Sequence, residues 1–591
     1  MISAIRRAFV LIDRADRWRW IALVPLIAIV AILETAGATA VVLLVRVLAD
    51  PGSMPRLARW LPGAGDPQAA ARSMTMAVVA FYIVRNFAII AIEYAEEHVI
   101  QRLAARISIG LLTRYLRAPY TFHLRNPSAA LIQRASMSVE TVVETMLAAL
   151  VHMVSEGVVT LGLLALMAVY APSATLAAAA TIAILLLAPL RLTRRLYLRW
   201  GEEERAVGQR LLADLHQSLD TIKEILVSGH QDYFAAKFAA DRARLRRYKT
   251  RRGSAGGAVR TGVETIFICA MLLAVTVLTT SGRSGSEVVS VLGLFAYAGF
   301  RIVPAANRII LHVNSIRFAR AYVEPMAVDW LALGEGAPPV TTAVWPPLAT
   351  SIEFDHVSYR YEDGRPDALA DVRLSIPRGE SIGIVGPTGA GKTTLVDVLL
   401  GLLTPTSGRV LVDGRDIRDA LPAWQAQIGY VPQQVMLVDD TLRRNIAFGV
   451  DDDRIDEARV VRVVRAARLD ALVASVPEGL GARVGERGVR LSGGERQRIA
   501  IARALYRDPA VLIFDEATSA LDHQTEREIA DAIDALRGER TVVVIAHRMA
   551  TVRTCDRLVV LDGGRVAAQG RFDELLVSSG LFRSLTADAS A

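Results

Sequence analysis

Long apolar stretches, separated by polar and arginine-rich stretches, dominate the first half of the chain. Six apolar runs are long enough to cross a bilayer as helices, which takes about 20 residues, although single charges interrupt several of them. They lie near residues 20–48, 74–94, 146–170, 174–190, 263–280 and 288–310. The pattern predicts an all-α transmembrane domain with six spanning helices over residues 1–331.

Positive charge gathers after the second and the fourth apolar runs. The arginines there are Arg102, Arg106, Arg114, Arg117 and Arg125, then Arg191, Arg194, Arg195 and Arg199. Cytoplasmic loops carry an excess of Lys and Arg, so we expect these segments and both termini to lie in the cytoplasm of a cell-membrane protein. Helical patterns over 202–225 and 231–249 predict that the membrane helices extend into the cytoplasm and reverse at short turns near 120–128 and 228–234.

The texture of the sequence changes after residues 332–350, a stretch rich in Pro, Gly, Ala and Thr that is typical of a linker. Beyond it, over 351–591, short β-rich runs alternate with helical stretches. The β-rich runs are 351–361, 409–412, 428–431, 511–514, 541–546 and 557–561. This alternation predicts an α/β domain with a largely parallel sheet.

The composition fits a membrane protein of at least two domains. The chain has 591 residues, 52% of them apolar, and a formal net charge of +8. A basic balance can indicate nucleic-acid binding, but here the arginines flank apolar runs, so we expect no nucleic-acid partner. With Cys269 and Cys555 as its two cysteines, the chain is expected to have neither a disulfide framework nor a Cys-based metal site.

One glycine-rich stretch of the second half matches the phosphate-loop pattern G-x-x-x-x-G-K-[ST], between a strand-like run at 381–385 and a helical run at 395–403. Its residues are Gly386, Pro387, Thr388, Gly389, Ala390, Gly391, Lys392, Thr393 and Thr394. Glycines let consecutive backbone N–H groups surround an anion, and a helix N-terminus adds positive potential. Lys392 can reach the β- and γ-phosphates, and the Thr393 hydroxyl can hold Mg²⁺. The stretch therefore predicts ATP and Mg²⁺ as ligands.

Two carboxylates, Asp515 and Glu516, follow the strand-like run at 511–514. The carboxyl ends of strands are where α/β sheets bind ligands. In combination with the phosphate loop, Asp515 is predicted to hold Mg²⁺ and Glu516 to polarise the attacking water.

A third motif, residues 491–498 (LSGGERQR), precedes that strand and leads into a helical run at 499–506. Ser492, Gly493 and Gly494 at a helix start form a second anion-binding terminus. This octapeptide resembles the signature motif of the ATP-binding cassette (ABC) family, and the resemblance spans the C-terminal half. It implies that the motif binds the nucleotide held by another subunit's phosphate loop. The expected partner is a second copy of this chain, in a homodimer.

The resemblance implies roles for four more residues. Tyr361 would stack on adenine, Gln433 would sense Mg²⁺ and the membrane domain, Asp522 would link the two sites, and His547 would contact the γ-phosphate. Gln434 is a second choice for the glutamine. Tyr361 and His547 also have structural interpretations, as a core aromatic and as a strand-end histidine. With Glu516, Gln433 and His547 complete the predicted catalytic set.

Four arginines lie in or next to the apolar runs: Arg85, Arg260, Arg301 and Arg308. A charge inside the bilayer costs about 2.5–3.5 kcal/mol on insertion scales, so it normally faces a cavity or a partner. Together they predict a cationic cavity suited to pyrophosphate, which arginine binds in a bidentate manner. The alternatives are pairing with Glu34, Glu93 or Glu264, or extension to the inner interface.

The stretch 300–309 is similar to a segment of the bacterial ABC flippases for lipid-linked oligosaccharides. Residues 32–35, Arg85, Arg260 and a possible outer helix at 56–61 also look like that group. The resemblance implies an ATP-driven flippase of polyprenyl-pyrophosphate-linked oligosaccharides. One alternative is a general lipid or multidrug exporter, which an apolar, aromatic-rich cavity would favour. Another is a membrane-tethered ATPase that regulates a partner and moves nothing.

Overall fold

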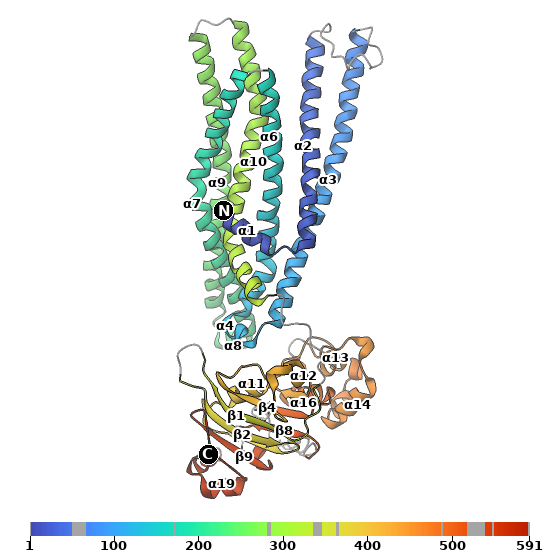
Figure 1. The fold of residues 1–591 in the computed structure, drawn as a ribbon, viewed down its shortest axis with the longest axis vertical. Helices are drawn as coiled ribbons and strands as arrows, with labels where there is room; N and C mark the ends of the chain where they lie inside the picture. The colour runs from blue at the N-terminus through green and yellow to red at the C-terminus, as the bar shows by residue number, and fades with distance from the viewer. Residues whose placement is uncertain are drawn as a thin grey trace. The chain divides into compact units, whose positions relative to one another are not determined.

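The computed structural model describes residues 2–49, 67–170, 172–280, 285–334, 345–361, 366–485, 488–516, 538–546 and 549–588. The chain forms two compact units (Figure 1). One comprises Met1–Ala118 and Phe122–Gly336 and is helical. The other comprises Pro119–Thr121 and Ala337–Ala591 and combines helices with two sheets.

Six long helices form the first unit. They are α2 (Arg14–Ala49), α3 (Pro67–Arg117), α6 (Ala148–Tyr170), α7 (Pro172–Asp220), α9 (Gln231–Thr280) and α10 (Gly285–Leu333). Each predicted apolar run lies in one of them, the third beginning in the short helix before α6. Within the described residues, three stretches are long and apolar enough to span a membrane, Arg72–Arg117, Ser128–Gly162 and Gln231–Leu273. The helices α3, α7, α9 and α10 have 49 to 51 residues, more than twice the about 20 residues that a bilayer requires.

Short helices begin the chain and turn it at the ends of the long ones. They are α1 (Ile2–Val10), α4 (Tyr120–Arg125), α5 (Ser128–Gln133), α8 (Ile222–Ser228) and the π-helical η3 (Arg134–Ser138) and η4 (Thr141–Leu147). The two predicted reversals coincide with α4 and with Gly229, which ends α8 in the left-handed conformation that glycine adopts without strain.

A buried polar network joins α3, η3 and α10. The Tyr115 hydroxyl donates to Asp329 Oδ2 at 2.7 Å, and Arg134 Nη1 donates to the same oxygen at 2.8 Å. Asp329 is 6% exposed. A carboxylate this deeply buried requires such partners, because removing one of them leaves an uncompensated charge. The network therefore fixes how these three elements pack.

The second unit contains a four-stranded antiparallel sheet and a six-stranded, mostly parallel sheet. The first has the order β2-β1-β4-β5, from β1 (Ser351–Tyr359), β2 (Leu369–Pro377), β4 (Ser407–Val412) and β5 (Arg415–Asp416). The second has the order β10-β9-β3-β8-β7-β6, from β3 (Ser381–Val385), β6 (Ile428–Val431), β7 (Val511–Asp515), β8 (Thr541–Ile545), β9 (Arg557–Asp562) and β10 (Arg565–Gly570). The predicted parallel sheet is the second one; the antiparallel sheet was not anticipated.

Both faces of the six-stranded sheet are covered, which explains why β3, β7 and β8 are buried along their whole length. In β7, Leu512 and Phe514 join a core with α16, whereas Val511 and Ile513 join a core with α11 and the antiparallel sheet. The helices of this unit are α11 (Lys392–Leu399), α12 (Leu421–Gln425), α13 (Leu442–Ile446), α14 (Glu457–Ala466), α15 (Asp470–Ser475), α16 (Gly493–Tyr506), α18 (Met549–Val552), α19 (Phe572–Ser578) and α20 (Gly580–Asp588), with 3₁₀ turns at Ile417–Ala420, Asp452–Arg454 and Gly479–Gly481.

Gly201 marks a close crossing of α7 and α10. A Cβ atom at Gly201 would lie 2.3 Å from the backbone oxygen of Phe318, which cannot move without shifting α10. We expect Gly201→Ala to lower the free energy of unfolding by about 1–3 kcal/mol, seen as a lower thermal unfolding midpoint in detergent. Gly253→Ala, in α9, is the control because no atom lies within 4 Å of its added Cβ. Equal midpoints for the two variants would contradict the close crossing.

Candidate functional site

The predicted phosphate loop connects β3 to α11. Gly389 and Gly391 have φ angles of +81° and +100°, in the left-handed region that favours glycine. A Cβ atom at Gly391 would also lie 2.5 Å from the Ala368 carbonyl oxygen. The path of the loop therefore depends on its glycines, as the pattern predicted.

Lys392 begins α11 with its side chain buried and turned back over the loop. Its Nζ donates to the carbonyl oxygens of Gly386, at 2.8 Å, and Pro387, at 3.1 Å. Burial lowers the pKa of Lys392, and the carboxylates of Glu516 and Asp515 oppose that shift. A buried ammonium group is costly, and a bound phosphate would provide a compensating charge.

The other residues of the phosphate loop differ in how exposed their side chains are. Thr388, Gly389 and Thr393 are exposed, Pro387 is half-buried, and Ala390 and Thr394 are buried. The exposed Thr393 hydroxyl is open to a ligand. Tyr361, predicted to stack on adenine, lies beside this turn: its hydroxyl is 3.3 Å from Thr394 Oγ1, and its ring packs edge-to-face on Tyr359 at 5.0 Å.

Asp515 and Glu516 stand at the carboxyl end of β7, close to residues from the neighbouring strand β6. The Tyr430 hydroxyl donates to Asp515 Oδ2 at 3.1 Å, and Gln433 Nε2 donates to Glu516 Oε2 at 2.6 Å. Burial raises the pKa of Asp515, and the bond from Tyr430 counteracts that rise. The structure thus brings Lys392, Gln433, Asp515 and Glu516 together, although Gln433 is 83 residues from Glu516 in the chain.

Glu516 has a φ angle of +49°, an uncommon conformation for a residue with a side chain. Its backbone N–H donates to the Ile545 carbonyl oxygen of β8 at 3.0 Å, which holds the chain in this conformation. Left-handed residues cost of order 1–3 kcal/mol and concentrate at functional sites. The strain agrees with the role predicted for Glu516.

The donor atoms at this end of the sheet fit Mg²⁺, which prefers oxygen ligands. Thr393 offers a hydroxyl and Asp515 a carboxylate. Gln433 donates its amide N–H to Glu516, and the carbonyl oxygen of the same amide can bind the cation. A cation held there would neutralise charge on bound phosphates. Within the described residues no group of three or more His, Cys, Asp or Glu could hold a metal ion, so phosphate oxygens or water would complete the coordination of Mg²⁺.

Ser492 is the N-cap of α16 in a reciprocal capping box. Its Oγ accepts from the Glu495 N–H at 3.2 Å, and its own N–H donates to Glu495 Oε2 at 2.7 Å. The sequence carried this signal as S-x-x-E, which our interpretation of the motif did not use. Ser492 is exposed, and Gly493 and Gly494 form the first turn, so the helix start is accessible to an anion.

Three of the predicted site residues have side chains outside the part of the chain that the structure describes. Asp522 and His547 lie outside the described residues, as does the possible outer helix at 56–61, and the side chain of Arg301 in α10 is likewise not described. Their roles remain predictions.

The described cavity arginines all have partners within this chain. Arg260 Nε donates to Glu264 at 3.1 Å, one of the pairings considered as an alternative. Arg308 binds Glu156 with two nitrogens, Nη2 donating to Oε2 at 3.0 Å, a pairing we did not anticipate. Arg85 donates to Asn86 and lies over the Tyr82 ring, both on its own helix α3. The belt of four arginines stays a prediction, because the side chain of Arg301 lies outside the described residues.

Two of these arginines nevertheless meet. Arg260 of α9 and Arg308 of α10 line one cavity of about 180 Å³, together with Tyr197, Asn307 and Asn314. The Asn307 Oδ1 atom is buried and has no hydrogen-bond partner among the described residues. The cavity is therefore lined by two cationic donors, whereas the Asn307 Oδ1 atom itself has almost no accessible surface.

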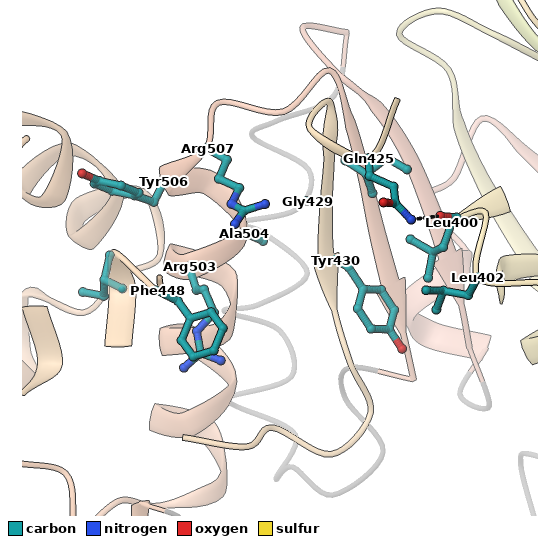
Figure 2. Close-up of a pocket in the computed structure, with 12 residues that line it drawn as sticks. Leu400, Leu402, Gln425, Gly429, Tyr430, Phe448, Arg503, Ala504, Tyr506 and Arg507 are labelled. Atoms are coloured by element: carbon teal, nitrogen blue, oxygen red, sulfur yellow. Dashed lines mark hydrogen bonds between the residues drawn. The ribbon is translucent and has the colours of Figure 1, made fainter. Parts of the chain in front are cut away.

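A second hollow, of about 320 Å³, lies beside the edge strand β6 and was not anticipated from the sequence (Figure 2). Its walls are mainly apolar, from Leu400, Phe448 and their neighbours. Arg503 is held there by the Asn445 carbonyl oxygen at 2.8 Å and lies over the Phe448 ring. Tyr430, the partner of Asp515, forms part of the wall, so this hollow adjoins the carboxylate site.

Comparison with known proteins gives concordant matches to both units. A family model described as "ABC transporter" matches residues 369–519, and one described as "ABC transporter transmembrane region" matches residues 24–300. The chain is 32% identical over 513 residues to an ATP-dependent lipid A-core flippase of Cupriavidus pinatubonensis (strain JMP 134 / LMG 1197), covering 85% of each chain. It is 31% identical over 575 residues to a protein of the same name from Burkholderia orbicola (strain AU 1054), covering 96% of this chain and 94% of the relative.

A solved bacterial Atm1-family ABC exporter with ATP bound has the same fold. The TM-score is 0.80 at 24% sequence identity, over 98% of this chain and 99% of that one. At this identity the likeness extends to fold alone.

Glu516→Gln tests the assignment of Glu516 as the base. The amide keeps an oxygen for Gln433 but cannot accept a proton from water, so we expect ATP to bind and its hydrolysis to fall by at least about 100-fold. ATP binding and phosphate release are the measurements. Glu478→Gln, at an exposed turn, is the control. Turnover near the wild-type rate in Glu516→Gln would refute the assignment.

Asp397→Asn tests whether the negative charge of Asp397, in the helix after the phosphate loop, destabilises the folded protein. Burial and the nearby Asp515 carboxylate raise the pKa of Asp397 to about 6. The folded state thus holds this proton more tightly than the unfolded chain, whose pKa is about 4. The contribution of Asp397 to stability therefore falls as pH rises from about 4 to about 6. We expect Asp397→Asn to raise the thermal unfolding midpoint more at pH 7.5 than at pH 5; an equal gain at both would contradict this.

Proposed function

The chain belongs to the ABC transporter family, and from this we propose that it is a flippase for a lipid whose head group carries sugar and phosphate. It is an exporter-type ABC protein, an ATPase coupled to transport across a membrane. The proposed direction is from the inner to the outer leaflet of the cell membrane, with the nucleotide-binding domain in the cytoplasm. We further propose domain limits of 1–331 and 351–591, joined by a linker at 332–350.

We assign the nucleotide chemistry to two copies of the chain. In each copy, residues 386–394 would hold the phosphates of ATP, Tyr361 the adenine, and Thr393, Asp515 and Gln433 the Mg²⁺. Glu516 would polarise the attacking water, with His547 at the γ-phosphate and Asp522 between the two sites. The second copy would complete each site with Ser492, Gly493 and Gly494. The capping box supports this last role, because Glu495 fixes the exposed start of α16.

The observation that carries the substrate proposal is the cavity between α9 and α10. Arg260 and Arg308 are donors suited to phosphate, and Asn307 adds an amide side chain to the lining. A phosphorylated sugar offers phosphate for the arginines and hydroxyl groups for the amide. Among the described residues that line this cavity, Tyr197 is the one aromatic side chain.

Glu156 bears on how tightly such a lipid would bind. Glu156 lies in α6, and its carboxylate forms an ion pair with the Arg308 guanidinium. The Glu156 side chain is 15% exposed. A phosphate that binds Arg308 would have to compete with this carboxylate. Arg260 is opposed less strongly, because its side chain is 73% exposed and Glu264 lies on the same helix.

Two lipids fit this chemistry. The relatives' name specifies lipid A-core, whereas the similarity at 300–309 favours a polyprenyl-pyrophosphate-linked oligosaccharide. Both join phosphate and sugar to long hydrocarbon chains. The general lipid exporter is the second candidate, supported by the family membership alone.

The double variant Arg260→Ala, Arg308→Ala tests the cavity. We expect ATP-driven flipping in proteoliposomes to fall by about tenfold or more, since both phosphate donors are lost, with basal ATP turnover largely kept. The assay would offer lipid A-core and a polyprenyl-pyrophosphate oligosaccharide separately. Arg199→Ala is the matched control, because Arg199 pairs with Glu203 four residues away as Arg260 pairs with Glu264.

Unchanged flipping in the double variant would remove the phosphate argument and leave the general exporter. If the wild-type protein moves neither lipid and its ATP turnover ignores both, the flippase proposal fails in favour of a membrane-tethered ATPase.

A further inference from the structure

Tyr430 occupies an unusual position between a hollow and the carboxylate site. It lies in β6, the edge strand of the six-stranded sheet, where its ring forms part of the wall beside Leu400 and Leu402 (Figure 2). Its hydroxyl leaves the hollow and donates to Asp515 Oδ2 at 3.1 Å. None of the motifs in the sequence singles out this tyrosine.

The sheet register explains why Tyr430 reaches Asp515. In the parallel pairing of β6 with β7, Tyr430 stands opposite Ile513 and Val431 opposite Phe514. Side chains two residues apart on a strand share a face, so Asp515 is on the face of Ile513. Tyr430 therefore meets Asp515, while Gln433, just beyond the end of β6, meets Glu516.

Tyr430 and Gln433, three residues apart, thus each donate a hydrogen bond to one of the two adjacent carboxylates. We infer that Tyr430 is a positioning residue for the cation ligand Asp515. This rests on the Mg²⁺ site of the proposed function. The hydroxyl donates a hydrogen bond to Asp515 Oδ2 and thereby fixes the rotation of the carboxylate. The other oxygen, Oδ1, is then held in one orientation in which it can bind the cation.

The burial of Asp515 supports this role. Asp515 is 8% exposed, so bulk water cannot readily replace a lost donor at Oδ2. Hydrogen bonds to ligating carboxylates typically change metal affinity by 10–100-fold when removed.

Tyr430→Phe removes the hydroxyl and keeps the ring in the hollow. The test uses the full-length protein carrying Glu516→Gln, so that ATP remains intact, with Mn²⁺ as a paramagnetic substitute for Mg²⁺. Electron paramagnetic resonance would measure ATP-dependent Mn²⁺ binding, and a fluorescent nucleotide would measure binding without metal. We expect Tyr430→Phe to weaken Mn²⁺ binding by about tenfold and to leave metal-free nucleotide binding within about twofold.

Tyr506→Phe is the matched control. Tyr506 lines the same hollow, but its hydroxyl accepts from the backbone N–H of Asp456. Removing the Tyr506 hydroxyl disturbs the wall of the hollow but breaks no hydrogen bond to Asp515, so this variant measures any structural damage. We expect Mn²⁺ binding in this variant to equal that of the parent.

Unchanged Mn²⁺ affinity in Tyr430→Phe, or equal weakening in both variants, would overturn the inference. A drop in metal-free nucleotide binding that matches the drop in Mn²⁺ affinity would also overturn it, because the effect would then be structural. If the parent itself shows no ATP-dependent Mn²⁺ binding, the Mg²⁺ site of the proposed function fails, which is a distinguishable result.

Discussion

The parallel pairing of β6, β7, β8 and β3 is the constraint on which the nucleotide-binding unit depends. Parallel strands end at the same edge of a sheet, so the phosphate loop after β3, the carboxylates after β7 and the glutamine after β6 arrive at one place. A shift of one residue in the pairing of β6 with β7 would turn Tyr430 away from Asp515 and Gln433 away from Glu516. Burial of the sheet on both faces makes such a shift costly, because Ile428 and Val431 of β6 would exchange cores.

That rigid frame supports a site that is unfavourable in itself. Lys392 and Asp515 are buried charges, Asp397 holds a proton at a raised pKa of about 6, and Glu516 has a strained backbone. Each feature opposes folding locally, and the surrounding cores offset that cost. The common cause is the withdrawal of charged groups from water, which also strengthens their interaction with phosphate and cation.

In the helical unit, the described arginines discussed above are paired with groups of the same unit. Arginines near the membrane-spanning stretches are satisfied by carboxylates or rings, on a neighbouring helix for Arg308 and Arg134 and on the same helix for Arg260 and Arg85. This pairing lowers the cost of each charge in an apolar setting. It also means that a head group would gain affinity for Arg308 only as the difference between its own interaction and that of Glu156.

The sequence by itself determined the two-part architecture, the six long helices and the phosphate loop, because apolar period, glycine positions and motif spacing are local properties of the chain. It also indicated that Arg260 could pair with Glu264, since four residues on a helix are neighbours. Only the tertiary structure decided that Glu156 binds Arg308, 152 residues away, that Tyr430 holds Asp515, and that Arg260 and Arg308 share a cavity. Those contacts depend on helix packing and on strand order, which arise from the whole chain folding together and leave no pattern in any one segment.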